Sequence, residues 1–148
     1  MSARPIEGFL EIAPVPLGLP VEEVERRLGP AARVLRKDDR PIGFQYPDLG
    51  VWLVAEDGAI LSVSFLTGTA DEDGAKFPGA LPGGLTVDDT PERALAVFGA
   101  PDRIQEIPLP KSRMILSFYE LTAPATVTIA VRSDHPSRFD RIVLARRP

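Results

Sequence analysis

Side chains that could carry out acid–base or nucleophilic chemistry are sparse in this sequence. His135 is the one histidine, and it lies in a turn-like stretch with Ser133, Asp134 and Ser137. A catalytic triad needs a nucleophile, a base that activates it and a third group that orients the base. Neighbouring positions in one turn do not supply that geometry, and the sequence has no Gly-x-Ser-x-Gly elbow. We therefore interpret His135 as an exposed turn residue.

Metal and phosphate sites have little support. The chain has no cysteine, so thiolate metal sites and cysteine nucleophiles are excluded. An EF-hand that began in the acidic run Asp71, Glu72, Asp73 would need a glutamate at its twelfth position, where the chain has Pro82. The glycine patterns of P-loops and dinucleotide-binding folds are also missing. We expect no enzyme activity, no metal and no cofactor.

The composition is typical of a soluble globular domain. The 148 residues, 44% hydrophobic and 26% charged, fit one domain spanning 1–148. The longest apolar runs are too short to cross a bilayer, and the N-terminal stretch lacks the pattern of a secretory signal. A formal net charge of −4 argues against general nucleic-acid binding, which needs a basic surface. We expect a cytoplasmic protein that binds neither nucleic acid nor membrane.

Two segments share a pattern that predicts a short capped helix. They are 18–30 and 84–101, and each runs from Gly-Leu through an acidic first turn to a Gly and then a Pro. In the second segment Thr90 is a good N-cap, Pro91 suits the first helical position and Gly99 suits the residue after the end. After each helix the hydrophobic period changes to that of a half-buried antiparallel strand. The predicted strands are 42–46, 51–55, 60–66, 114–119, 127–132 and 141–145, with 34–36 and 103–107 as further candidates.

The sequence therefore predicts an α+β fold made of two tandem copies of a short helix followed by an antiparallel β-sheet, with the helices packed on one sheet face. The pseudo-repeats cover about 15–67 and 84–146. A Gly- and Pro-rich loop, 68–83, joins them and is either a linker or a loop that contacts a partner.

The predicted sheet offers a candidate recognition surface. If Val51, Leu53 and Phe118 face the helices, then Trp52 and Tyr119 lie on the open sheet face. Aromatic anchors among small polar residues are typical of protein interfaces. Two alternatives stay open, since Trp52 could be a core residue and the assignment of faces could be inverted.

Short motifs give the chain a resemblance to known proteins. They are Gly18, Leu28-Gly29-Pro30 and Tyr46 in the first half, and Gly84, Phe98-Gly99, Pro101 and Tyr119 in the second. Over about 15–146 this pattern resembles the tandem-repeat β-lactamase inhibitory proteins and the related small lipoproteins of the outer-membrane assembly machinery. Those proteins carry disulfides or a lipid-modified cysteine, whereas this chain has no cysteine. The resemblance therefore implies a cytoplasmic relative that blocks another protein, as toxin immunity proteins do.

Three hypotheses follow. The first is a protein-binding inhibitor, specifically a bacterial toxin immunity protein, that occludes the active site of a basic toxin domain with Trp52, Tyr119, Asp71, Glu72 and Asp73. The second is a non-catalytic scaffold or self-associating structural protein that pairs through an exposed strand edge. The third is an enzyme that uses carboxylates or the lone histidine.

Overall fold

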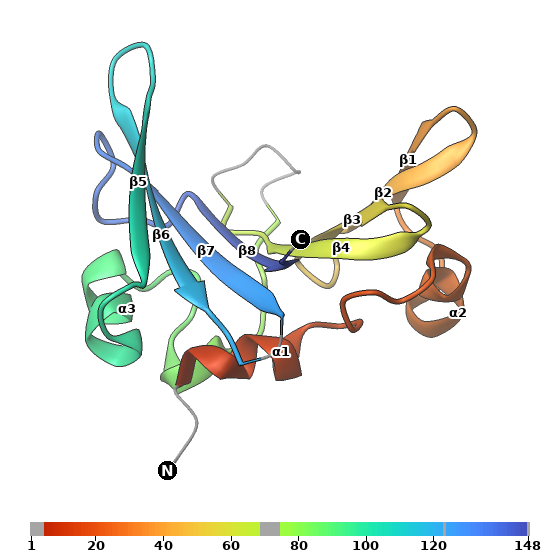
Figure 1. Cartoon of the computed structure of the whole chain (residues 1–148), viewed down its shortest axis with the longest axis horizontal. Helices are drawn as coiled ribbons and strands as arrows, with labels where there is room; N and C mark the ends of the chain where they lie inside the picture. The colour runs from red at the N-terminus through yellow and green to blue at the C-terminus, as the bar shows by residue number, and fades with distance from the viewer. Residues whose placement is uncertain (1–4, 69–74, 123, 148) are drawn as a thin grey trace.

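Eight strands form one continuous antiparallel sheet in the computed structural model, which describes residues 5–68, 75–122 and 124–147 (Figure 1). Their order across the sheet is β1-β2-β3-β4-β8-β7-β6-β5. The strands are β1 (Arg33–Lys37), β2 (Arg40–Tyr46), β3 (Val51–Glu56), β4 (Ala59–Phe65), β5 (Arg103–Pro108), β6 (Arg113–Glu120), β7 (Ala125–Arg132) and β8 (Arg141–Arg146).

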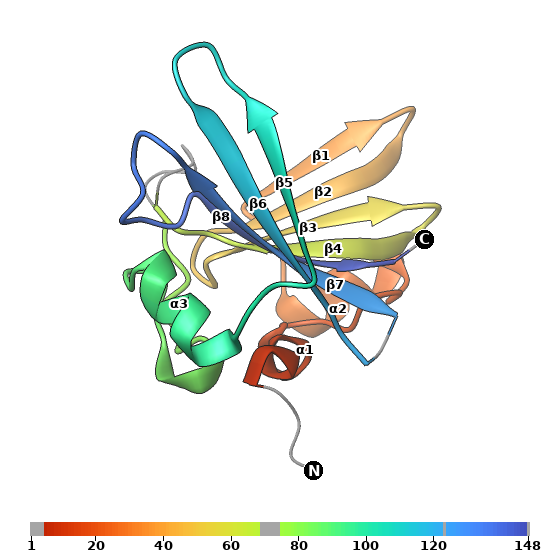
Figure 2. The same cartoon turned by 60° about the vertical axis from the view of Figure 1, so that its left-hand side comes forward.

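The helices are short and lie on one side of the sheet, as Figure 2 shows. They are α1 (Phe9–Ile12), α2 (Val24–Leu28) and α3 (Pro91–Phe98), with 3-10 turns at Pro5–Gly8, Val21–Glu23 and Pro82–Gly84. Among the described residues, none of the helices has the length and apolar character needed to span a membrane.

The predicted fold class is wrong. Two tandem helix-plus-sheet copies were expected, whereas the described chain is dominated by one eight-stranded antiparallel sheet with three short α-helices. The pairing of β4 with β8, which places Val63 opposite Leu144 and Phe65 opposite Ile142, makes the sheet continuous. This pairing joins strands from opposite halves of the chain. Local hydrophobic patterns cannot reveal it, because they report only which residues share a face within one strand.

Individual elements agree better with the sequence. Every predicted strand is present, including the two further candidates that became β1 and β5. Thr90 caps α3, since its Oγ1 accepts a hydrogen bond from the Arg93 N–H at 3.2 Å, and Gly99 ends the helix with φ of 84°. In the first half the predicted helix is reduced to α2 and the preceding 3-10 turn. Helix α1 was not predicted.

The core lies between the helices and one face of the sheet. Along β3, Val51 and Leu53 are buried, as expected for a strand covered on one side. Phe9 of α1 lies at the centre, with its ring centroid 5.4 Å from that of Phe65 and 5.9 Å from that of Phe98. Because Phe65 belongs to β4 and Phe98 to α3, Phe9 connects the two halves of the chain in one core.

None of the helices in the described part of the chain lies over the opposite face of the sheet. The hairpins β1–β2 and β5–β6 rise at the two ends of the sheet, away from the helices, so this face is concave (Figures 1 and 2). We call it the open face.

Candidate functional site

The centre of the open face is built around Trp52 of β3. Residues directly opposite each other in antiparallel strands share a sheet face. Trp52 therefore lies with Gln45 of β2 and Ser64 of β4, which are its register partners. Its neighbours Val51 and Leu53 are buried on the other face. The prediction that Trp52 lies opposite Val51 and Leu53 is confirmed.

The Trp52 indole is held by close packing over Gly43 of β2. A Cβ added to Gly43 would lie 2.9 Å from Trp52 Nε1 and 3.4 Å from Leu35 Cδ1, so the indole nitrogen and the Leu35 side chain meet above this glycine. The Nε1 atom is buried there and has no hydrogen-bond partner among the described residues. A buried, unpaired N–H costs about 1–3 kcal/mol. Trp52 as a whole is only partly buried, so the indole is fixed and still contributes to the surface.

A shallow pocket of about 180 Å³ lies beside Trp52. The open-face side chains Val54, Ser64 and Arg141 line it together with Phe65 and Thr67. It joins the centre of the sheet, β3 and β4, to the neighbouring strand β8. Asp140, next to Arg141 in the chain, lines the pocket as well, so a side chain from another protein would find an aromatic ring, an aliphatic wall and residues of both charges there.

Apolar side chains continue the open face onto β6. Met114, Leu116 and Phe118 point to this side, because they are paired with Arg132, Ala130 and Thr128 of β7. All three are partly exposed. The guanidinium carbon of Arg103 lies 4.1 Å from the Phe118 ring centroid, a cation–π contact that holds an arginine over the ring.

Sequence reasoning missed this part of the face. It assigned Phe118 to the helix side, whereas the structure places it on the open face. A signal was available, because Met114, Ile115 and Leu116 form an unbroken apolar run. Such a run indicates a strand with apolar side chains on both faces.

The charges on the open face are mainly positive. Register places Arg33 of β1, Arg103 of β5, Arg132 of β7 and Arg141 of β8 on this side. Arg132 is paired with Asp134 at 2.9 Å, whereas Arg33 and Arg141 form no ion pair with any described residue. The face therefore combines apolar side chains with uncompensated guanidinium groups.

Tyr119 is not on the open face, and that prediction is wrong. It is 2% exposed, its hydroxyl donates to the Gly99 carbonyl oxygen at 2.9 Å, and its ring centroid lies 6.2 Å from that of Phe98. The physical reason is the register of β6, which pairs Tyr119 with buried Val127. The sequence interpretation had inverted the faces of this strand.

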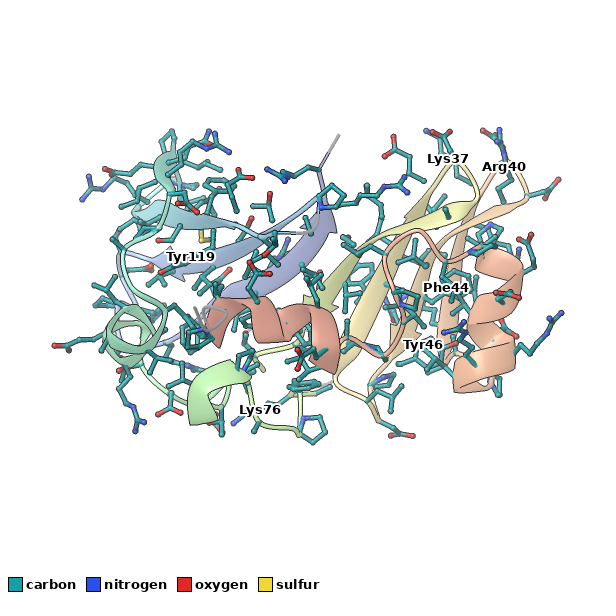
Figure 3. The ribbon with its side chains drawn as sticks, turned by 60° about the horizontal axis from the view of Figure 1, so that its bottom comes forward. Lys37, Arg40, Phe44, Tyr46, Lys76 and Tyr119 are labelled. Carbon is teal, nitrogen blue, oxygen red and sulfur yellow. The ribbon has the colours of Figure 1, made fainter. Side chains whose placement is uncertain are left out.

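Tyr46 occupies a matching position in the first half of the chain, and Figure 3 labels both tyrosines. Its hydroxyl donates to the Gly29 carbonyl oxygen at 2.9 Å. Burial raises the pKa of Tyr46 above its ordinary value, and the charge of Glu25 raises it further. Each tyrosine thus links the end of a helix to the sheet through a hydrogen bond.

The predicted acidic contact residues Asp71, Glu72 and Asp73 lie outside the described residues. The chain that follows them packs on the body of the protein. Phe77 lies with its ring centroid 5.0 Å from that of Phe65, and Lys76 Nζ lies 2.9 Å from Asp88 Oδ1. This arm of the loop therefore covers one edge of the core.

The His135 turn borders a separate pocket of about 280 Å³, lined also by Arg132 and Arg138. The His135 side chain is 67% exposed, and Nε2 lies 3.8 Å from Asp134 Oδ2. Desolvation opposes the ionisation of Asp134, but hydrogen bonds from Arg132 and the backbone hold its pKa below the ordinary value. Within the described ranges, no group of three or more His, Cys, Asp or Glu residues could hold a metal ion.

Comparisons with known proteins give information on the fold alone. No family model matches the chain, and a search of the curated proteins finds no match. The structure is similar to that of a DUF4309 family protein, YjgB, from Bacillus subtilis subsp. subtilis strain 168. The TM-score is 0.52 and the sequence identity 17%, over 86% of this chain and 78% of the other. At this identity, the similarity concerns the overall fold and not the function.

Proposed function

We propose that this chain is a protein-binding inhibitor that covers a functional surface of another protein with its open face, in the specific role of a bacterial toxin immunity protein in the cytoplasm. One observation carries the proposal. A concave sheet face, over which none of the described helices lies, presents a tightly packed tryptophan and further apolar side chains among arginines. Tryptophan, methionine, phenylalanine and arginine are the residue types enriched in protein interfaces.

The geometry of Trp52 supports a role as the anchor of that interface. Binding hot spots are enriched in Trp, Tyr and Arg and lie near the centre of an interface, in well-packed surroundings. Trp52 lies on β3, which is an interior strand of the sheet and not an edge strand. Its indole packs over Gly43, and a pocket lies beside it. Little side-chain entropy remains to be lost when a partner covers it.

The arginines of the open face indicate the charge of the partner. Arg33 and Arg141 would be complementary to carboxylates on the other protein, and Arg103 is already held over Phe118. Complementary charge raises the rate and selectivity of association. We therefore propose a partner with an acidic surface opposite this face. From the sequence, we expect the acidic run Asp71–Asp73 to contact a basic toxin domain. That expectation concerns the loop and not the open face, and it stays a prediction.

A capture experiment with matched variants tests the proposal. The wild-type chain, Trp52→Ala and Leu95→Ala would be immobilised and exposed to the native cytoplasm. Leu95 is the control because it is a large apolar residue that is 52% exposed on α3, on the helix side. We expect a stoichiometric partner on wild type and Leu95→Ala, with affinity for Trp52→Ala reduced by about 2 kcal/mol or more.

The inhibitor role then requires a second measurement. The captured protein would be purified, and its activity measured with increasing amounts of wild-type chain and of Trp52→Ala. Loss of activity at one equivalent of wild type, with Trp52→Ala far less effective, supports the proposal. A partner that binds both variants equally, or that stays fully active in the complex, contradicts it.

A self-associating scaffold is the second candidate, and one observation favours it. Edge strand β5 is exposed along its whole length, and Ile104 on it is 60% exposed. Exposed edges with apolar side chains are templates for pairing with another chain. Sedimentation at increasing concentration distinguishes this function, since it requires an oligomer that Ile104→Lys disperses and Trp52→Ala leaves intact.

A further inference from the structure

A second pocket lies on the helix side of the sheet, where the proposed function does not use it. Its volume is about 300 Å³. Its lining comes from α1 and the chain that follows it, from the start of β7 and from the end of β8. The lining includes Leu10, Ala13 and Leu17 from α1 and the chain that follows it, and Pro124 and Leu144 from the sheet side.

The lining is almost entirely aliphatic. Val15, Ala125 and Leu144 belong to the core and are 1% exposed, so they form a closed floor. Leu10, Ala13 and Leu17 are only partly buried and leave the pocket open to solvent. Small-molecule sites have volumes of roughly 300–1,000 Å³, apolar linings and a few well-placed polar groups. The volume of this pocket lies at the lower end of that range.

The one charged group of the lining is Arg146, at the end of β8. Along β8, Ile142, Leu144 and Arg146 alternate to the helix side, whereas Arg141 points to the open face. A Cβ added to Gly18 would lie 3.3 Å from Arg146 Nη1, so the guanidinium lies next to Gly18, just after Leu17 in the pocket wall. Arg146 makes no ion pair with any described residue.

We propose that this pocket binds a fatty acid of medium chain length. Its aliphatic chain would lie against the apolar lining, which includes Leu10 and Leu144, and its carboxylate would bind Arg146. An engineered cavity of about 150 Å³ lined by apolar side chains holds a benzene molecule, so twice that volume accommodates a chain of about eight to twelve carbons. A guanidinium forms strong bidentate hydrogen bonds with a carboxylate. The apolar floor and the single cation at the rim match the two ends of such a molecule.

Calorimetric titration of the full chain with decanoate, below its micellar concentration, tests the site. We expect saturable binding at one equivalent, weakened at least tenfold in Arg146→Gln. Binding of decan-1-ol, which has the chain without the charge, should change less than twofold in that variant. Each CH₂ removed from the acid should weaken binding by up to about fourfold, from the transfer free energy of a buried methylene.

Two further variants separate the pocket from adventitious binding. Ala13→Leu fills the cavity and should weaken decanoate and decan-1-ol alike, whereas Arg27→Gln removes an exposed arginine of α2 that does not line the pocket and should weaken neither. The urea midpoint of each variant shows whether it is folded. The proposal is overturned by a wild-type chain that does not saturate, by Arg146→Gln and Arg27→Gln having equal effects, or by a folded Ala13→Leu that binds as tightly as wild type. None of these outcomes bears on the open face.

Discussion

At the scale of single residues, two tyrosine hydroxyls fasten helix ends to the sheet. The last carbonyl groups of a helix have no partner within the helix. Tyr46 donates to the carbonyl oxygen of Gly29, which follows α2, and Tyr119 donates to that of Gly99, which follows α3. Both distances are 2.9 Å. Each hydroxyl therefore pairs a backbone oxygen at the helix end with a donor from the sheet.

Tyr46→Phe should lower the free energy of unfolding by about 0.5–1.5 kcal/mol at neutral pH, through loss of this hydrogen bond. The effect should also depend on pH. The pKa of Tyr46 is raised in the folded state, so its stabilising contribution is complete below the ordinary value of 10.0 and is lost as the pH rises through the folded-state value. Urea unfolding at several pH values, from neutral to above that value, measures both effects.

The control for that measurement is Tyr119→Phe, which removes the matching hydroxyl from the other half of the chain. It should also lower stability at neutral pH. A stability difference between wild type and Tyr46→Phe that stays constant at high pH would contradict the assignment of the titration to Tyr46.

The contrast between Trp52 and Tyr119 shows how far the candidate site was predictable. In β3 all residues from Val51 to Ala55 are apolar, so strand alternation set Trp52 opposite Val51 and Leu53 but left open which of the two faces the helices cover. In β6 the apolar run from Met114 to Leu116 gives both faces the same character. The face of Tyr119 then depends on its register with β7 and on its contact with Phe98, which are tertiary properties.

At the scale of elements, two tight turns of similar geometry have different sequences. In the β3–β4 turn Asp57 and Gly58 have φ values of 53° and 78°, and in the β1–β2 turn Asp38 and Asp39 have values of 54° and 64°. Two-residue hairpins of this kind favour glycine because both central residues have positive φ. The β1–β2 turn therefore carries backbone strain at Asp39. The β3–β4 turn avoids this strain because Gly58 occupies the matching position.

Asp39→Gly should raise the free energy of unfolding by about 1 kcal/mol, since a left-handed backbone costs non-glycine residues about that amount. The reverse substitution, Gly58→Asp, should lower it by a similar amount and serves as the matched control. Both are measured by urea unfolding. If Asp39→Gly is destabilising, the turn must depend on the Asp39 side chain and not on backbone conformation.

Sequence patterns predicted the helix whose ends are marked by its own capping residues, and missed the helix that depends on tertiary packing. Helix α3 was predicted because Thr90, Pro91 and Gly99 mark its ends. Helix α1 was missed because Phe9–Ile12 spans only four residues, too few to show a helical period. Its position depends on Phe9, which packs against Phe65 and Phe98 from distant parts of the chain.

At the scale of the whole molecule, the sheet is continuous only because β4 and β8 pair. The strands are separated by most of the second half of the sequence, and their contact places Val63 opposite Leu144. Hydrophobic patterns within one strand do not report which strands pair, so the sequence is consistent with several strand orders. Register between distant strands is decided by the shared core, which explains why the elements were predictable and the fold class was not.

One core predicts one unfolding transition, and Leu144→Ala tests it. Leu144 is 1% exposed and lies between Val63 of β4 and Val127 of β7, so its truncation should cost about 2–5 kcal/mol. The only tryptophan, Trp52, reports on the first half of the chain, far from Leu144 in sequence. If the sheet unfolds as a unit, the fluorescence and far-UV circular dichroism midpoints must fall together. A Trp52 transition that stays at the wild-type midpoint while the circular dichroism midpoint falls would mean that the halves unfold independently.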